Sequence, residues 1–284
     1  MRDFLEPLRL TFPYRVWMSI YFLFKKKYFT HLKTFCFFIG YPRSGHTLIG
    51  ALIDAHPNAF MGIEVNVLNL LKHKFNRNQV LGVIVRRNNF FYKKWKGIWT
   101  GYNYKVDGLW QNSFEEVHLI GDKKGTGTTH LLQQHPELLN ELQHEINLPL
   151  KIIHVVRNPY DIITTAALHK ARKVKINPDK IFDAHIDAFI RFAETNNRLI
   201  SEQGNIIHTL KHEELIASPK KELGKLFHFL GLSYDTDYIN KLAKVIYKEP
   251  NITRNKFNWT LEQIAKVAEI ISRYDFLKGY SYNG

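Results

Sequence analysis

Short apolar runs alternate with longer amphipathic stretches from Thr34 to the C-terminus. Four of the runs predict buried strands: Thr34–Ile39, Val117–Ile120, Lys151–Val156 and Ile206–Leu210. The stretches between them have the spacing of helices. Strands that alternate with helices are typical of a parallel sheet covered on both faces. The pattern therefore predicts an α/β fold of three layers, with a central, mainly parallel sheet flanked by helices.

Local signals mark the ends of several helices. Asn158 is a good N-cap residue with Pro159 at the first helical position, and Thr260 and Gln263 have the spacing of a capping box. The predicted helices are Thr47–Ala55, Thr128–His144, a segment that starts at Asn158, Asn177–Glu202, Ser218–Leu230, and a last helix from Thr260 to near Gly279. No Gly/Ser/Pro-rich linker divides these elements, which favours one domain.

The first 33 residues precede this pattern and predict a helical extension, so that residues 34–284 form a single domain. Trp17–Phe24 is an apolar run bounded by Arg15 and by the cluster Lys25, Lys26 and Lys27. A membrane-spanning helix needs about 20 apolar residues, and this run is too short. No signal-peptide cleavage pattern follows it. We expect the extension to pack on the domain, and peripheral contact of residues 1–33 with a membrane surface is the alternative.

The amino-acid composition limits the kinds of binding partner and the cellular location that we expect. The chain of 284 residues has 40 Lys+Arg against 26 Asp+Glu, a net charge of +14, which favours an anionic partner such as a nucleotide, nucleic acid, acidic glycan or membrane. Cys36 is the single cysteine, which excludes an intrachain disulfide, and no Cys/His spacing is of the zinc type. We therefore expect a reducing, cytoplasmic location and no metal.

A glycine-containing loop, Gly40–Thr47 (GYPRSGHT), lies between the first predicted strand and the helix after it. In that position backbone N–H groups and a helix N-terminus can bind phosphate. The spacing is nearly that of the nucleotide P-loop, GxxxxGK[ST], but His46 occupies the lysine position and the cation of the loop is Arg43. The loop predicts a P-loop-like phosphate site, and a nucleotide-dependent kinase or NTPase is one alternative.

The segment Arg43–Thr47 (RSGHT) resembles the 5′-phosphosulfate loop, [RK]-S-G-T-[TS], of sulfotransferases that use 3′-phosphoadenosine 5′-phosphosulfate (PAPS). The similarity continues through Leu48–Pro57, where it is closest to tyrosylprotein and related bacterial sulfotransferases. The resemblance implies that the 5′ side of PAPS is bound by Arg43, Ser44, Gly45, His46, Thr47 and Leu48. His46 stands where the family has threonine, so backbone amides would carry most of that contact.

A second signature follows the third predicted strand. Arg157 and Thr165, eight residues later, match the family's binding site for the 3′-phosphate of PAPS. A guanidinium binds phosphate in a bidentate manner; a structural pairing of Arg157 with Asp161 is the alternative. Arg254 and Lys256 resemble the family's late loop, which closes over the 3′-phosphate, and here an ordinary exposed basic loop is the alternative.

The resemblance implies transfer of the sulfuryl group of PAPS to a hydroxyl acceptor, with release of adenosine 3′,5′-bisphosphate (PAP) and without a metal. Fixed cations must neutralise the leaving phosphate. Arg43 and Lys123 are the candidates, although Lys123 and Lys124 could be a solvated pair. In-line transfer also needs a general base for the acceptor hydroxyl. We expect a carboxylate, Glu64, in this role, and His130 is the alternative base.

Basic and aromatic residues are interleaved in residues 84–112, between Glu64 and Lys123. Such a mixture could bind nucleic acid, which makes a non-catalytic nucleic-acid-binding protein the second alternative. It could equally pack as an amphipathic surface. We expect it to form a wall on the acceptor side of the site. The expected acceptor is a hydroxylated small molecule, glycan or peptide, and no nucleic acid partner is expected.

Overall fold

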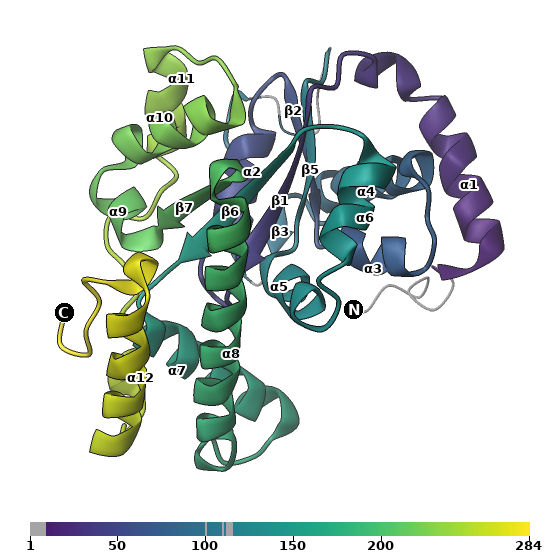
Figure 1. Ribbon diagram of the computed structural model, residues 1–284. Coiled ribbons are helices and arrows are strands. Elements are labelled where there is room, and N and C mark those ends of the chain that lie inside the picture. The colour runs from purple at the N-terminus through teal and green to yellow at the C-terminus, as the bar shows by residue number, and fades with distance from the viewer. Residues whose placement is uncertain (1–9, 100, 110, 112–115) are drawn as a thin grey trace.

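A computed structural model describes residues 10–99, 101–109, 111 and 116–284, and its centre is a sheet of five parallel strands (Figure 1). The strand order is β2-β5-β1-β6-β7. The strands are β1 (Thr34–Gly40), β2 (Ala59–Ile63), β5 (Leu119–Lys123), β6 (Leu150–Val156) and β7 (Ile207–Lys211). The predicted α/β fold with a parallel central sheet is confirmed. Because all five strands run in the same direction, their carboxyl ends meet at one edge of the sheet.

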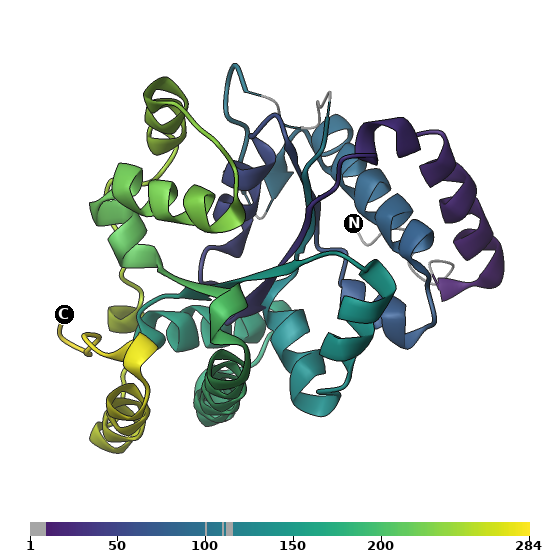
Figure 2. The same ribbon diagram turned by 45° about the horizontal axis from the view of Figure 1, so that its top comes forward.

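Helices cover both faces of the sheet (Figures 1 and 2). Phe38 of β1 faces a cluster with α2 (His46–Asp54), α9 (His212–Ala217), α10 (Pro219–Leu230) and α11 (Thr236–Ala243). Phe37 faces the other cluster, with α3 (Val67–Lys72), α4 (Arg77–Lys93), α5 (Gly125–Gln134), α6 (Leu138–Ile146) and α8 (Asp179–Gln203). Alternate side chains of one strand thus enter two separate cores, as a strand buried on both faces requires.

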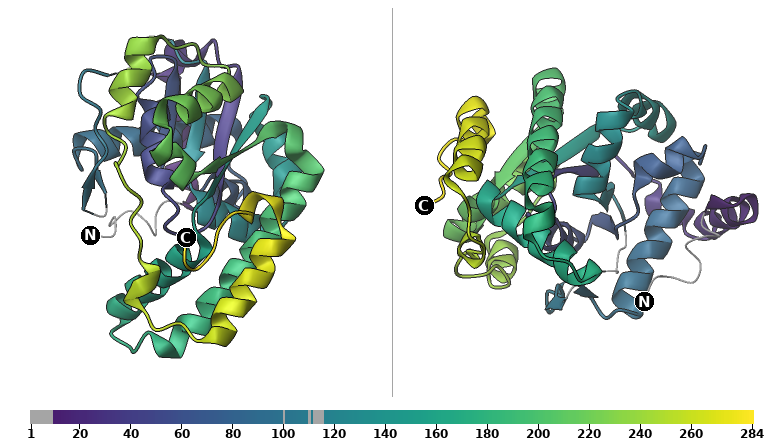
Figure 3. Two further views of the ribbon diagram at one scale, coloured as in Figure 1. Left: turned by 90° about the vertical axis from the view of Figure 1, so that its left-hand side faces the viewer. Right: turned by 90° about the horizontal axis from the view of Figure 1, so that it is seen from below.

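The remaining elements pack around this three-layer body. In a third hydrophobic cluster, α7 (Pro159–Val174) and α12 (Leu261–Arg273) pack against α8 (Figure 3). At the opposite side of the molecule, α1 (Phe12–Leu23) lies against α4. The short elements are a hairpin of β3 (Ile98–Trp99) and β4 (Tyr102–Asn103), and the 3-10 helices η2 (Lys26–Phe29), η3 (Gly204–Ile206), η4 (Arg254–Lys256) and η5 (Asp275–Leu277).

Several predicted boundaries were wrong. The helix predicted over Thr128–His144 is two helices, α5 and α6, because Pro136 cannot continue the first one. The strand predicted at Val117–Ile120 runs later, as β5, so that Lys123 is its last residue. β2 and α4 were not predicted at all, and α12 ends at Arg273 instead of near Gly279.

The predicted caps of α7 and α12 are confirmed. The Asn158 side chain accepts a hydrogen bond from the Tyr160 N–H (3.0 Å), and Thr260 and Gln263 form a reciprocal capping box. The N-terminal extension contains α1, which packs on the domain as expected; residues 1–9 lie outside the described part of the chain. No helix in the described ranges combines the length and apolar character needed to span a bilayer.

Candidate functional site

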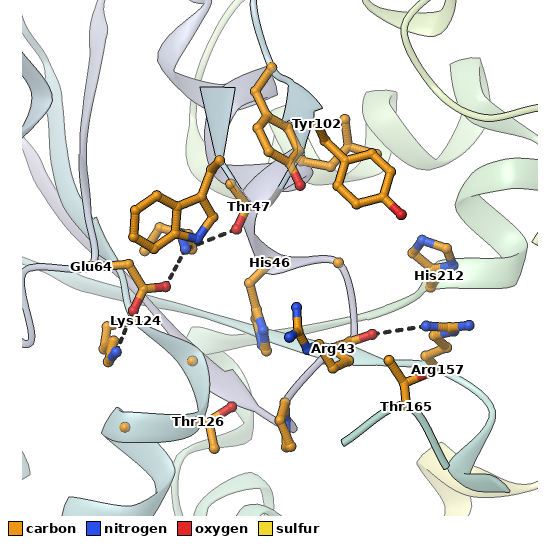
Figure 4. A pocket seen from close by; sticks show the side chains of 18 of the residues that line it. Arg43, His46, Thr47, Glu64, Tyr102, Lys124, Thr126, Arg157, Thr165 and His212 are labelled. Carbon is orange, nitrogen blue, oxygen red and sulfur yellow. Dashed lines mark hydrogen bonds and ion pairs between the residues drawn. The ribbon is translucent and has the colours of Figure 1, made fainter. Parts of the chain in front are cut away.

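The carboxyl ends of all five strands converge on one cleft of about 330 Å³ (Figure 4). Glu64 follows β2, Lys123 ends β5, Arg43 lies in the loop after β1, Arg157 follows β6 and His212 follows β7. The carboxyl edge of an open parallel sheet is the place where α/β proteins bind ligands. The topology therefore brings together residues that lie up to about 170 positions apart in the chain.

The loop between β1 and α2 adopts a conformation suited to an anion. Arg43 and Gly45 have positive φ angles of 65° and 95°, and Gly45 immediately precedes the first helical residue of α2. A Cβ atom at Gly45 would lie 2.7 Å from Cδ2 of His212, so glycine permits both the turn and the close approach. Ser44 is buried and donates to the Tyr41 carbonyl (2.7 Å), so its hydroxyl holds the loop instead of lining the cleft.

His46, at the lysine position of the P-loop pattern, is not a cation. Its Nε2 donates to the Ile39 carbonyl at 3.2 Å, and its ring lies close to Gly125 at the start of α5. Burial, with a smaller contribution from the nearby Lys123, lowers the pKa of His46 to about 4. A neutral imidazole cannot supply the charge that a P-loop lysine gives to a triphosphate. This environment disfavours a kinase or NTPase of the usual P-loop type.

Glu64 lies between two lysines (Figure 4). Lys123 Nζ contacts Glu64 Oε1 at 2.5 Å and Thr47 Oγ1 at 3.0 Å, and Lys124 Nζ binds the other carboxylate oxygen of Glu64. Burial would raise the pKa of Glu64, but the two ammonium groups outweigh this effect and hold the pKa at about 2. Lys123 is almost fully buried, so it is no solvated surface residue. It joins the carboxylate of Glu64 to Thr47 at the start of α2.

Two further residues fix this arrangement. Asp122, the buried neighbour of Lys123, accepts hydrogen bonds from the N–H groups of Val65 (2.9 Å) and Val67 (3.1 Å) and so ties the segment after Glu64 to β5. Burial raises the pKa of Asp122 to about 6. On the other side, a Cβ atom at Gly50 of α2 would lie 2.7 Å from Cγ of Lys123. The lysine stem therefore fills the space that this glycine leaves open.

Arg157 holds the loop between β1 and α2 from the β6 side (Figure 4). Its Nη1 donates to the Arg43 carbonyl at 3.0 Å, and its Nη2 donates to the Asn251 carbonyl. The Nε atom is buried without a hydrogen-bond partner among the described residues. Thr165 also lines the cleft and shares a hydrogen bond of 2.8 Å with Thr253. The two residues of the second signature thus lie in the same cleft as the glycine loop.

The late loop is fastened to α7 by a buried ion pair. Arg254 Nη1 lies 2.7 Å from Asp161 Oδ2, and Asp161 Oδ1 accepts from the N–H groups of Thr253 (2.6 Å) and Arg254 (2.8 Å). The salt bridge of Asp161 is therefore with Arg254, and the alternative pairing with Arg157 is not present. Arg254 does not line the cleft, and Lys256 is exposed outside it. The loop positions Asn251 over Arg157 through its backbone.

Aromatic side chains form one wall of the cleft. Trp99, Tyr102 and Tyr104 line the cleft, and Tyr247 faces Tyr102 with ring centroids 6.0 Å apart. Behind this wall, aromatic rings from the end of α4 pack on one another: Phe90, Phe91, Tyr92 and Trp95. Phe91 and Tyr92 form one hydrophobic cluster with Trp95, Trp99 and Tyr104, so they support the wall from behind.

The other predicted residues divide between cleft and surface. Thr47 and Leu48 line the cleft, whereas His130 is exposed on α5, where its ring faces Phe192. Sequence reasoning missed Lys124 as a partner of Glu64. It also missed the N-terminus of α5, where Gly125, Thr126 and Gly127 line the cleft beside α2. Within the described part of the chain, no group of three or more His, Cys, Asp or Glu side chains is placed to hold a metal ion.

These features define an α/β protein with a P-loop-like loop at the carboxyl edge of its sheet and a carboxylate beside that loop. The family model for the sulfotransferase domain matches residues 33–274, and the chain therefore belongs to the sulfotransferase family. Among curated relatives, the omega-hydroxy-beta-dihydromenaquinone-9 sulfotransferases of Mycobacterium bovis and Mycobacterium tuberculosis are each 28% identical over 141 residues. That match covers 44% of this chain and 35% of each relative, about one third of the relative's length.

Solved structures share the fold at low sequence identity. A sulfotransferase of Mycobacterium avium superposes with a TM-score of 0.52 at 11% identity, over 86% of this chain and 77% of the other. The sulfotransferase domain of the Synechococcus PCC 7002 olefin synthase gives a TM-score of 0.53 at 18% identity, over 86% and 96% of the two chains.

Proposed function

We propose that this protein transfers the sulfuryl group of PAPS to a hydroxyl group of an acceptor and releases PAP. The observation that carries the proposal is the cleft itself. It brings together a glycine loop that contains Arg43, two further cations, Lys123 and Arg157, and the carboxylate of Glu64. Family membership supports the same reaction. We further propose that residues 34–284 act as one sulfotransferase domain in the cytoplasm.

The residues of the cleft fit a nucleotide with phosphates at two positions. Backbone N–H groups of Gly45, His46 and Thr47, at the start of α2, would hold the 5′ side, together with the side chains of Arg43 and Thr47. Leu48 would contribute through its side chain, because its N–H donates to the Gly45 carbonyl (3.0 Å). Arg157 and Thr165 would hold the 3′-phosphate. The Nε of Arg157 has no hydrogen-bond partner in the described part of the chain, and this phosphate would supply one. Lys256 lies outside the cleft, and we assign Arg254 a positioning role through Asp161.

Glu64 acts as the base in this proposal. Its carboxylate takes the proton of the acceptor hydroxyl, whose oxygen forms the new O–S bond while the S–O bond to PAP breaks. Lys123 and Arg43 stabilise the charge that collects on the departing phosphate oxygen. When Lys123 turns from Glu64 to that oxygen, the carboxylate loses one of its two cations and its pKa rises from about 2, which makes it a stronger base at the time it is needed.

The acceptor side is the aromatic wall of Trp99, Tyr102, Tyr104 and Tyr247. Such a wall favours a hydroxyl carried on an apolar or sugar-like framework over a highly charged acceptor. The curated relatives are named for a hydroxylated menaquinone derivative, which makes hydroxylated apolar molecules the first class to screen. Glycans and hydroxyl-bearing peptides complete the panel.

Calorimetry with PAP tests the donor site. We expect micromolar binding in EDTA, because the site uses fixed cations in place of a metal. Arg157→Gln should weaken PAP about tenfold or more, since a charged, bidentate phosphate contact is lost. Arg273→Gln, in an exposed pair with Glu269 on α12, is the matched control and should bind normally. Binding of Mg-ATP without binding of PAP would contradict the proposal in favour of a kinase or NTPase.

A further inference from the structure

Helix α1 lies at the outer edge of the molecule, held against α4 by one face only (Figures 2 and 3). Tyr14, Met18 and Phe22, spaced four residues apart, are buried on that face. A side chain at Gly82 of α4 would collide with the Met18 carbonyl, so the two helices are in close contact. Arg15 bonds to Gln79 and to the Lys74 carbonyl, which turns the only charged residue of α1 toward the body.

The opposite face of α1 is entirely apolar. Every exposed residue of the helix is apolar: Phe12, Pro13, Val16, Trp17, Ile20 and Leu23. Phe24, directly after the helix, is exposed as well and extends this apolar stripe. Phe12, Leu23 and Phe24 are 73%, 57% and 78% exposed. A surface helix of a water-soluble domain normally presents charged and polar residues on this side. A continuous apolar stripe of this kind is typical of a binding surface.

The charge around the stripe is positive. Lys25, Lys26 and Lys27 follow it directly, and Lys33 comes shortly after. The guanidinium of Arg86 on α4 lies 5.0 Å from the ring of Trp17. Residues 7–53 contain no Asp or Glu, and the carboxylate of Glu116 lies beside His31 and Lys33. Lys26 and Lys27 are exposed next to the stripe, where an anionic partner can reach them.

We propose that α1 docks the protein on the surface of an anionic phospholipid bilayer. The helix lies flat in the interface with its apolar stripe among the acyl chains, while Lys25, Lys26 and Lys27 bind lipid headgroups. A second copy of this chain fits the surface less well. A two-fold contact through α1 would add a second lysine cluster and, within residues 7–53, no acid to neutralise either. In the expected cytoplasmic location, the protein would meet the cytoplasmic leaflet of a membrane, which carries the anionic lipids.

Vesicle flotation of the full chain tests this proposal. We expect strong binding to vesicles that contain phosphatidylglycerol and weak binding to phosphatidylcholine alone, with binding reduced by salt. The double substitution Ile20→Gln with Leu23→Gln should lower partitioning about tenfold or more, because two inserted side chains are lost. Leu261→Gln is the matched control, since Leu261 is an exposed apolar residue (86%) on α12, far from α1 (Figure 1).

Both substituted residues are exposed, so the double variant should keep the wild-type PAP affinity and melting temperature. Phe12→Gln, at the other end of the stripe, is a second variant in case the first does not fold. The proposal fails if the wild type does not float with anionic vesicles, or if the stripe variants and Leu261→Gln bind equally well. It also fails if sedimentation shows a dimer that Ile20→Gln with Leu23→Gln dissociates while vesicle binding is absent.

Discussion

Glu64 is held in a conformation that it would not adopt by itself. Its φ angle of 58° lies in the left-handed region, which costs a non-glycine residue about 1–2 kcal/mol. The strain is maintained by the bond from the Glu64 N–H to the Lys123 carbonyl (3.3 Å) and by the two bonds that Asp122 accepts from the following residues. Backbone strain of this kind is concentrated at functional sites, because it fixes a side chain in one direction.

Replacement of Glu64 separates catalysis from donor binding. Glu64→Gln keeps the shape but removes the base, so we expect turnover to fall about 100-fold or more. PAP should bind as tightly as before or tighter, since Lys123 and Lys124 are no longer neutralised. Because the pKa of Glu64 is about 2 in the free protein, its protonation should produce no loss of kcat/KM between about pH 8 and pH 5.

The alternative base is tested in the same assay. His130→Gln should keep turnover near the wild-type level, because the ring is exposed outside the cleft. The rate of PAP release and the calorimetric affinity for PAP, measured for both variants, distinguish Glu64 from His130 as the base. An active Glu64→Gln protein together with an inactive His130→Gln protein would reverse the assignment.

The close packing of α2 against β5 at Gly50 determines where the Lys123 side chain points. Gly50 faces the stem of Lys123 from the middle of α2, and the ammonium group then reaches both Thr47 and Glu64. A glycine inside a helix normally costs about 1 kcal/mol relative to alanine. Here it leaves the space in which a buried lysine can lie along a neighbouring helix, and so helix packing contributes directly to the site.

Gly50→Ala should therefore reduce activity while helix propensity improves. The new Cβ atom would lie 2.7 Å from Lys123 Cγ, in the stem, where the lysine cannot move without shifting its ammonium group. We expect turnover to fall about tenfold or more. The matched control is Gly224→Ala in α10, whose Cβ would meet only the hydroxyl end of Tyr234, a partly exposed side chain that can move away. Gly224→Ala should keep activity and melt at the same or a higher temperature; full activity of Gly50→Ala would contradict this role.

The elements differ in how much of them the sequence predicts. β1, β6 and β7 follow from apolar runs with clear flanking signals, whereas the five residues of β2 (AFMGI) have no alternation and were missed. Parallel strand ends explain why Lys123 and Arg157 could be expected in one cleft. Glu64 follows the missed strand β2, so it was expected there only from the family resemblance. The pair Asp161–Arg254 joins residues far apart in the chain, and it depends on how the late loop folds over α7, which no local pattern encodes.

At the scale of the whole molecule, three buried histidines with lowered pKa values lie in or next to the carboxyl half of the sheet. His46, His154 and His212 belong to three different elements, and burial lowers their pKa values to about 4, 3 and 4. His154 is fully buried, and its Nδ1 lies 3.2 Å from Thr209 Oγ1. Each of these groups must take up a proton in a dry environment if the folded protein is acidified. The protein should therefore be sensitive to mild acid.

The sign of the effect follows from the direction of these shifts. A histidine whose pKa is lowered in the folded state binds fewer protons than in the unfolded chain, so it contributes stability above about pH 6.5 that is lost as the pH falls. Asp122 acts in the opposite direction, since its pKa is raised to about 6 and its ionisation above that pH costs stability. Three histidines against one carboxyl group leave a net loss in acid. We expect the free energy of unfolding in urea to fall between about pH 7 and pH 5.

His154 should account for a measurable part of this loss. With a folded pKa of about 3, it contributes about 2 kcal/mol of destabilisation at about pH 5 relative to the unfolded chain. His154→Gln removes the titration, so its free energy of unfolding should fall less steeply with acid, whatever its stability at neutral pH. His228→Gln, which replaces an exposed histidine on α10, should keep the wild-type slope. Equal slopes for all three proteins would mean that His154 is already protonated or hydrated in the folded state, and that the carboxyl half of the sheet is less dry than its packing indicates.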